Sequence, residues 1–173
     1  MNRGPEAQIV TQAAAYIREQ RNRLLGGART LDPTRRATFE PYCNPLDLDR
    51  VRLIESPAVE IPVPAFYNFL RVAGVTDLPD FTHVTAITFD DLIVAREPLK
   101  PRILLHELVH VAQYRILGVD RFAQLYVRGF LRSRKYEDIP LERIAYELDA
   151  RFWREQRFNV DSELLADAEF VLS

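Results

Sequence analysis

An apolar stretch in the middle of the chain, LLHELVHVAQY at residues 104–114, carries polar side chains whose spacing limits how the chain can fold. At about 100° per residue, an α-helix places His106 and His110 side by side, with Gln113 and Tyr114 on the same arc. Leucine, valine and alanine fill the other side, so we expect a buried helix. Buried polar side chains are costly unless they are paired. The fold must therefore supply partners for this face.

His106, Glu107 and His110 form the pattern HExxH. Imidazoles at positions i and i+4 can reach one Zn²⁺ ion at about 2.0–2.1 Å, and the adjacent glutamate can approach a water on that ion. The alternative interpretation is a buried helix whose histidines make ordinary core hydrogen bonds. We favour the metal site, because two histidines and a glutamate on one apolar helix leave several polar groups to be paired. The sequence predicts His106 and His110 as zinc ligands.

A third protein ligand is expected from the helix predicted over residues 140–157. No histidine follows His110, which excludes a site with three histidines of the HExxHxxGxxH type. The apolar face of the predicted helix is bordered by Glu142 and Asp149, whereas Glu147 falls on the solvent side. We therefore predict Glu142 as the third metal ligand and keep Glu147 as the alternative.

This ligand set predicts the chemistry of a zinc-dependent peptidase. Three protein ligands leave a position for water, and Glu107 can act as general base for that water. The oxyanion that forms needs a hydrogen-bond donor, for which the candidates are Tyr146, Tyr114, Tyr136 and His83. Tyr146 is included among the predicted catalytic residues. An extended peptide or protein substrate can pair with the edge of the hairpin predicted near residues 86–95.

A non-catalytic metal site is the competing prediction. Cys43 is the chain's single cysteine, and its thiol could close the zinc site as a fourth ligand. The metal would then stabilise the fold or an assembly. A glutamate at the second position of the motif has no purpose in such a site, so we favour the enzyme.

Composition restricts the partners and the compartment. The formal charge is −2 over 173 residues, without the basic excess that binding to nucleic acid or an anionic membrane would need. One cysteine provides no internal disulfide, and no run of about 18 apolar residues occurs. We expect a cytoplasmic protein without a Sec-type signal peptide, with other export routes left open, and make no prediction of oligomeric state.

The pattern of elements predicts one α+β domain. Helices are expected at residues 5–25, 64–74, 101–117, 120–132, 140–157 and 162–172, with Asp120 as an N-cap. A strand is expected at residues 50–55 and a hairpin at 83–96, whereas residues 28–49 read as irregular. The result is a small, mostly antiparallel sheet packed on the HExxH helix, with further helices C-terminal to it. The core is expected at residues 46–157, and the N-terminal helix at 5–27 either packs on it or extends from it.

The segments HELVHVAQY, AITFDDLIVA, DLDRVRLIE, LGVDRFAQLY and IPLERIAYELDA together resemble the short bacterial zincin-like proteins of the contractile-injection-system core domain family. The resemblance covers roughly residues 46–151. It implies a minimal gluzincin, with HExxH on one helix, a glutamate on a later helix and an edge strand over the cleft. One departure is Tyr146, where many gluzincins with an E-x-x-A-D motif carry an aspartate that orients a ligating histidine. Asp149 is the expected substitute.

Overall fold

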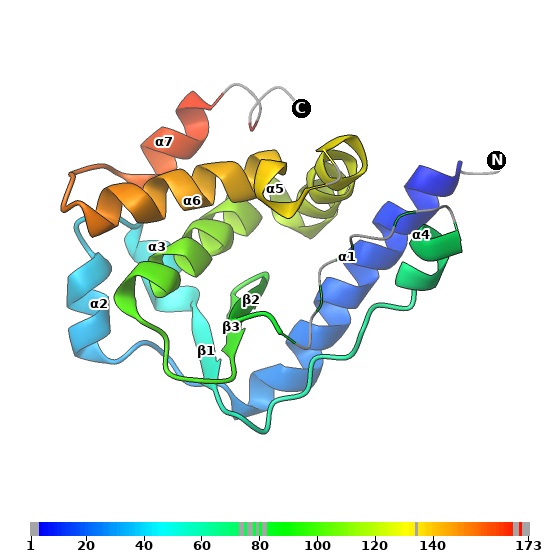
Figure 1. The fold of residues 1–173 in the computed structure, drawn as a ribbon. Helices are drawn as coiled ribbons and strands as arrows, with labels where there is room; N and C mark the ends of the chain where they lie inside the picture. The colour runs from blue at the N-terminus through cyan, green and yellow to red at the C-terminus, as the bar shows by residue number, and fades with distance from the viewer. Residues whose placement is uncertain are drawn as a thin grey trace.

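The computed structural model describes residues 4–72, 75, 78, 80, 83–133, 135–167 and 170. Helices surround a small sheet in an α+β arrangement (Figure 1). The helices are α1 (Pro5–Leu24), α2 (Pro33–Phe39), α3 (Pro45–Arg50), α4 (Tyr67–Val72), α5 (Pro101–Ser133), α6 (Pro140–Trp153) and α7 (Val160–Ala166), with short 3-10 helices η1 (Leu25–Gly27) and η2 (Tyr136–Asp138). Within the described ranges, no helix combines the length and apolar character needed to cross a membrane.

The prediction of irregular chain over residues 28–49 is wrong, because α2 and α3 form there. Each begins with a proline in its first turn, Pro33 and Pro45, where the missing N–H costs nothing. The preceding Asp32 and Asn44 side chains accept hydrogen bonds from backbone N–H groups of these first turns. The prolines of this segment therefore mark helix starts and not irregular chain.

The sheet contains the predicted hairpin, but it is mixed rather than mostly antiparallel. Strands β1 (Arg52–Glu55), β2 (Ala86–Phe89) and β3 (Leu92–Ala95) are arranged in the order β1-β3-β2. β2 and β3 pair antiparallel, whereas β1 pairs parallel to β3. β1 therefore runs in the same direction as β3 and opposite to β2, and the connection from β1 to β2 includes α4. β2 is consequently an edge strand of this sheet, as the hairpin prediction required.

The HExxH helix belongs to α5, which changes direction at Gly118. This residue has φ +74° and ψ 162°, a backbone conformation in which glycine is favoured. The break falls between the two helices predicted for this region. Asp120, the predicted N-cap of the second of them, accepts a hydrogen bond from Arg18 of α1 at 2.7 Å through its carboxylate.

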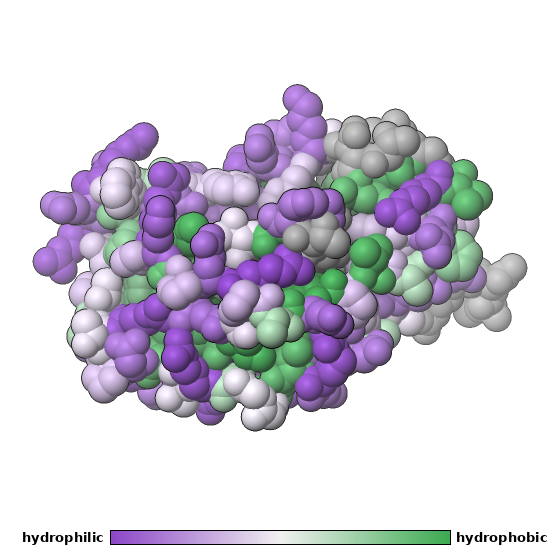
Figure 2. All heavy atoms as spheres, turned by 60° about the horizontal axis from the view of Figure 1, so that its bottom comes forward, coloured by the Kyte–Doolittle hydropathy of each residue, from purple (hydrophilic) through white to green (hydrophobic). Residues whose placement is uncertain are grey.

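The N-terminal helix α1 packs on the domain and does not extend from it. Its Ala13, Ala14 and Gln20 are buried, and it lies against α5 and β2. The Arg21 guanidinium donates to both carboxylate oxygens of Asp91, at 2.7 and 3.0 Å, and so ties α1 to the hairpin turn. Figure 2 shows this side of the molecule, where apolar surface lies at the centre and right among polar side chains.

The most extensive contact between helices joins α5 to α6 and brings the two predicted ligand-bearing segments together. Ala145 of α6 is fully buried, as expected for close packing. At the start of α6, Gly129 of α5 lies so near that an added Cβ would be 2.9 Å from Pro140 Cδ and 3.1 Å from Ile139 Cγ2. The distance between the helices at this end therefore depends on Gly129.

We predict that Gly129→Ala lowers the free energy of unfolding by about 1 kcal/mol, since overpacking costs about 1–3 kcal/mol and the higher helix propensity of alanine returns up to about 1 kcal/mol. Gly26→Ala is the matched control, because its Cβ would meet nothing within 4 Å. Urea denaturation of both variants measures the difference. Equal stability of the two would mean that Gly129 does not set the α5–α6 distance.

Candidate metal centre

Three buried side chains from α5 and α6 converge on one point. The Nε2 atoms of His106 and His110 lie 3.2 Å apart, and the Glu142 Oε2 lies 3.2 Å from the first and 3.4 Å from the second. Tetrahedral ligands at about 2.0–2.1 Å from a zinc ion are separated by about 3.3 Å, so these donor atoms are spaced as such a site requires. The group can hold a metal ion. It combines the ligands predicted from the sequence.

The first histidine is oriented by a carboxylate. His106 Nδ1 lies 3.2 Å from Asp149 Oδ2, and the other Asp149 oxygen accepts a 2.7 Å hydrogen bond from Arg102 Nε. A hydrogen bond at Nδ1 fixes the ring and directs Nε2 toward the metal, which is how ligating histidines are usually held. Asp149 thus holds the His106 ring with its Nδ1 atom toward α6, as expected for the residue that orients this histidine.

The second histidine is oriented by an amide. His110 Nδ1 lies 2.8 Å from Gln113 Oε1, and the Gln113 Nε2 donates to the carbonyl oxygen of Leu141 at 3.0 Å. Gln113 is fully buried and connects α5 to the first turn of α6, one residue before Glu142. The same residue therefore orients one ligand and locates the helix that bears another.

Glu142 is held from its other side by tyrosine. Tyr126 OH donates to Glu142 Oε1 at 3.1 Å, which leaves Oε2 directed at the two imidazoles. Burial, with the nearby Glu142 charge, raises the pKa of Tyr126 and of Tyr136 well above the usual value, so both hydroxyls keep their protons. The carboxylate is thus fixed without being neutralised.

The electrostatics of this group favour a cation. Burial disfavours a charged imidazole, but the Asp149 and Glu142 carboxylates outweigh it and raise the pKa of His106 to about 10. The pKa of His110 is also raised, since Glu142 more than offsets burial. Burial likewise disfavours the Glu142 carboxylate, yet the two imidazoles hold its pKa well below the usual range. The buried carboxylates therefore favour positive charge between the rings, which a divalent cation supplies.

Glu107 lies beside the ligand group without joining it. Its Oε2 accepts a 2.6 Å hydrogen bond from Thr88 Oγ1 of β2, and both side chains are buried. Thr88 also offers its carbonyl oxygen to Tyr114 OH at 3.3 Å. The edge strand thus fixes the position of the glutamate that the sequence predicted as a base.

Of the other predicted residues, two tyrosines lie near the ligand group, whereas Glu147 and His83 are exposed. Tyr146 is 40% exposed, and its ring centre lies 4.6 Å from that of His106. Tyr136 lines the same cavity as Glu142 and His110. Glu147 is exposed, whereas Glu142 is 1% exposed, which supports the choice of ligand. His83 is an exposed turn residue whose Nδ1 lies 2.7 Å from Asp80 Oδ2.

Cys43 does not join the metal-ligating group found among the described residues. It is buried in the main apolar core, and its backbone N–H donates to the Phe39 carbonyl oxygen at the end of α2. Burial, with the charges of Asp47 and Asp161, raises the pKa of its thiol, which disfavours the thiolate that zinc requires. The predicted alternative of closure by Cys43 has no support in this geometry.

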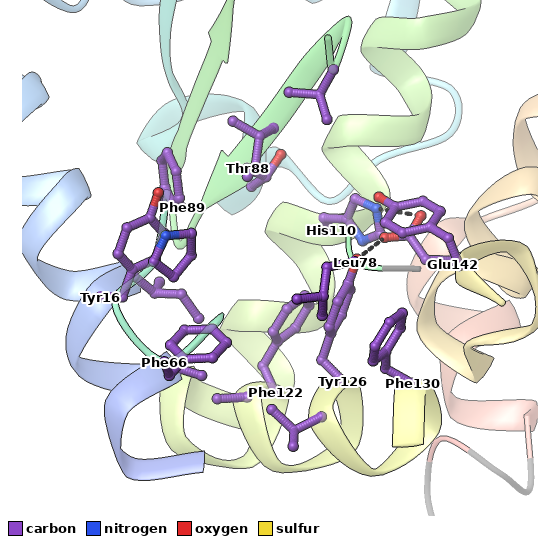
Figure 3. A pocket seen from close by; sticks show the side chains of 18 of the residues that line it. Tyr16, Phe66, Leu78, Thr88, Phe89, His110, Phe122, Tyr126, Phe130 and Glu142 are labelled. Carbon is purple, nitrogen blue, oxygen red and sulfur yellow. Dashed lines mark hydrogen bonds and ion pairs between the residues drawn. The ribbon is translucent and has the colours of Figure 1, made fainter. Parts of the chain in front are cut away.

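A cavity of about 130 Å³ opens beside the ligands. Glu107, His110 and Glu142 contribute to its wall, and Figure 3 shows His110 and Glu142 at one end with Tyr16 and Phe66 at the other. Phe122, Tyr126 and Phe130 project into it from the second half of α5. All three side chains are buried or partly buried.

Several of these contacts were missed in the sequence. Thr88, Tyr126 and Arg102 reach the site from positions whose relation to the motif depends on tertiary structure. Thr88 could have been found from strand periodicity. It shares a strand face with Ala86, which packs on the core, so its hydroxyl is a polar group on an inward-facing side. Gln113 also had a signal, since it lies one turn from His110 on the same helix.

Comparisons with protein-family models, curated proteins and solved structures gave no match to this chain.

We predict that the purified protein binds about one zinc ion per chain and that Glu142→Ala loses it, because a direct ligand is removed. Glu147→Ala is the matched control, with the same substitution on the exposed side of α6, and it should retain zinc. Elemental analysis after dialysis measures both. Full zinc content in Glu142→Ala together with depletion in Glu147→Ala would overturn the ligand assignment.

Proposed function

We propose that the protein is a zinc-dependent metallopeptidase of the gluzincin type, in which Glu107 is the general base. The observation that carries this proposal is the position of Glu107. Its carboxylate is buried beside the two histidines, lines the cavity and is held by Thr88, yet it is not part of the metal-ligating group found in the described part of the chain. A zinc ion held by His106, His110 and Glu142 would lower the pKa of a coordinated water and polarise a carbonyl group.

The chain's own residues account for the proton transfers. Glu107 accepts a proton from the attacking water and delivers it to the leaving amine. The Thr88 hydroxyl holds one carboxylate oxygen at 2.6 Å, so the other oxygen can face the water. Tyr146, whose ring centre lies 4.6 Å from that of His106, is the proposed donor to the oxyanion. The Tyr136 hydroxyl lies in the wall of the same cavity but interacts with Glu142. Tyr114 is less suited, since its hydroxyl already donates to Thr88.

The edge strand supplies a place for an extended substrate. β2 borders the sheet, and residues 86–89 line the cavity next to Glu107. A peptide added along this edge would gain backbone hydrogen bonds without requiring a particular sequence. We therefore propose a peptide or protein substrate, with no role for nucleic acid or a membrane. We also propose that the likeness to the contractile-injection-system core domain family reflects common descent.

The competing function is a metal site that only stabilises the fold. Such sites are generally closed by four protein ligands. Among the described residues the group has three, and Cys43 lies in the core instead. This arrangement supports the enzyme over the structural site.

The test is Glu107→Gln, which keeps the size of the side chain and a hydrogen bond to Thr88 but removes the proton acceptor. We predict unchanged zinc content and a rate of peptide cleavage lower by about 10²–10⁴-fold, the usual contribution of a general base. Cleavage of a broad peptide library, read by mass spectrometry with and without phenanthroline, measures it. Glu147→Gln is the matched control and should cleave like the wild type.

Identical cleavage patterns from wild type and Glu107→Gln would show that the activity comes from a contaminant and that Glu107 is not the base. Zinc binding without cleavage by the wild-type protein would favour the structural site.

A further inference from the structure

The cavity beside the ligands has walls from separate parts of the chain. α1 contributes Ala13 and Tyr16, the turn before α4 contributes Phe66, and β2 contributes Phe89, opposite the aromatic side chains of α5. Figure 3 shows Tyr16 and Phe66 facing Phe122 across the open space. The N-terminal helix is thus a wall of the same cavity that reaches Glu107 and His110.

The walls are mainly apolar, and three of the tyrosines in them use their hydroxyl groups in hydrogen bonds to other protein groups. Tyr16 OH donates to the Pro62 carbonyl oxygen at 2.6 Å, Tyr114 OH to Thr88 and Tyr126 OH to Glu142. Among the described residues that line the cavity there is no lysine, arginine or aspartate. The two carboxylates stand only at the end where the metal ligands meet. An acidic group inside would therefore be buried without a partner, at high cost.

The size of the cavity fits one side chain. Its volume is about 130 Å³. An apolar cavity of about 150 Å³ in another protein stays dry and binds benzene, so a phenyl ring or a branched aliphatic group is the appropriate scale. A smaller group would leave the aromatic walls without contacts, and a larger one would not fit.

We propose that this cavity receives one large apolar side chain, aromatic or branched aliphatic, from the substrate residue next to the hydrolysed bond, and that α1 forms its far wall. The assignment to a substrate rests on the proposed peptidase function, whereas the affinity of the cavity for an apolar group does not. Ala13 is the critical wall residue, since it is buried and its small side chain leaves the space open.

α1 is held firmly enough to serve as a wall. Arg21 binds Asp91 through two hydrogen bonds, Arg18 binds Asp120 at 2.7 Å, and Tyr16 binds Pro62. Each contact joins α1 to a different segment around the cavity. A larger side chain at position 13 should therefore enter the cavity rather than displace the helix.

The first experiment measures binding of 4-fluorotoluene by ¹⁹F NMR, which requires neither zinc nor activity. We expect saturable binding at one site in the wild type, loss in Ala13→Phe, and retention in Ala15→Phe, the matched control on the exposed side of α1. Ala123→Leu, which fills the cavity from α5, provides a second test if Ala13→Phe does not fold, as judged by circular dichroism. Equal binding of 4-fluorobenzoate, or no effect of either filling variant, would overturn the proposal.

The second experiment compares peptides that differ at one residue next to the cleaved bond. The wild type should prefer phenylalanine or leucine over alanine by at least about tenfold in kcat/KM, as expected for an apolar pocket. Ala13→Phe should reverse this preference while retaining zinc and cleavage of the alanine peptide. Binding of 4-fluorotoluene without this reversal would overturn the substrate assignment. Absence of any cleavage despite that binding would overturn the proposed function and leave the apolar cavity established.

Discussion

The contact of the buried Glu142 carboxylate with two imidazoles is the interaction on which the rest of the structure depends. All three groups are almost removed from solvent, and none could remain there alone without a large desolvation cost. Their contact requires α5 and α6 to lie close, which Ala145 and Gly129 permit. Gln113 and Asp149 then fix both rings with Nε2 directed inward. The close packing of α5 and α6 and the convergence of the three ligand-type side chains therefore depend on each other.

The same constraint explains how the remaining elements serve the site. β2 brings Thr88 against Glu107, and the change of direction at Gly118 turns the second half of α5 so that Tyr126 reaches Glu142. On the opposite face of α5, Arg115 pairs with Asp47 of α3 and Asp161 of α7. These ion pairs hold the outer helices against α5, while α1 closes the apolar cavity. The candidate metal centre is thus assembled from one long helix and the elements docked on it.

Sequence reasoning succeeded where periodicity carries the information. Helical spacing placed His106 and His110 together, and the apolar face of α6 distinguished Glu142 from Glu147 before any coordinates. It failed for α2 and α3, because a high proline and aspartate content is typical both of irregular chain and of helix starts. It could not place Thr88 or α1 at the site, because both contacts depend on how distant segments meet. The sequence also did not predict the parallel pairing of β1 with β3, since local patterns do not specify strand order.

The central claim is a metal centre with two imidazoles and one carboxylate from the protein. X-ray absorption spectroscopy at the zinc edge of the zinc-loaded protein tests it most directly, because nitrogen and oxygen at about 2.0–2.2 Å are resolved from sulfur at about 2.3 Å. The account predicts two imidazoles and otherwise oxygen in the first coordination shell. A sulfur neighbour, which only Cys43 or Met1 could supply, or an imidazole count other than two, would contradict it.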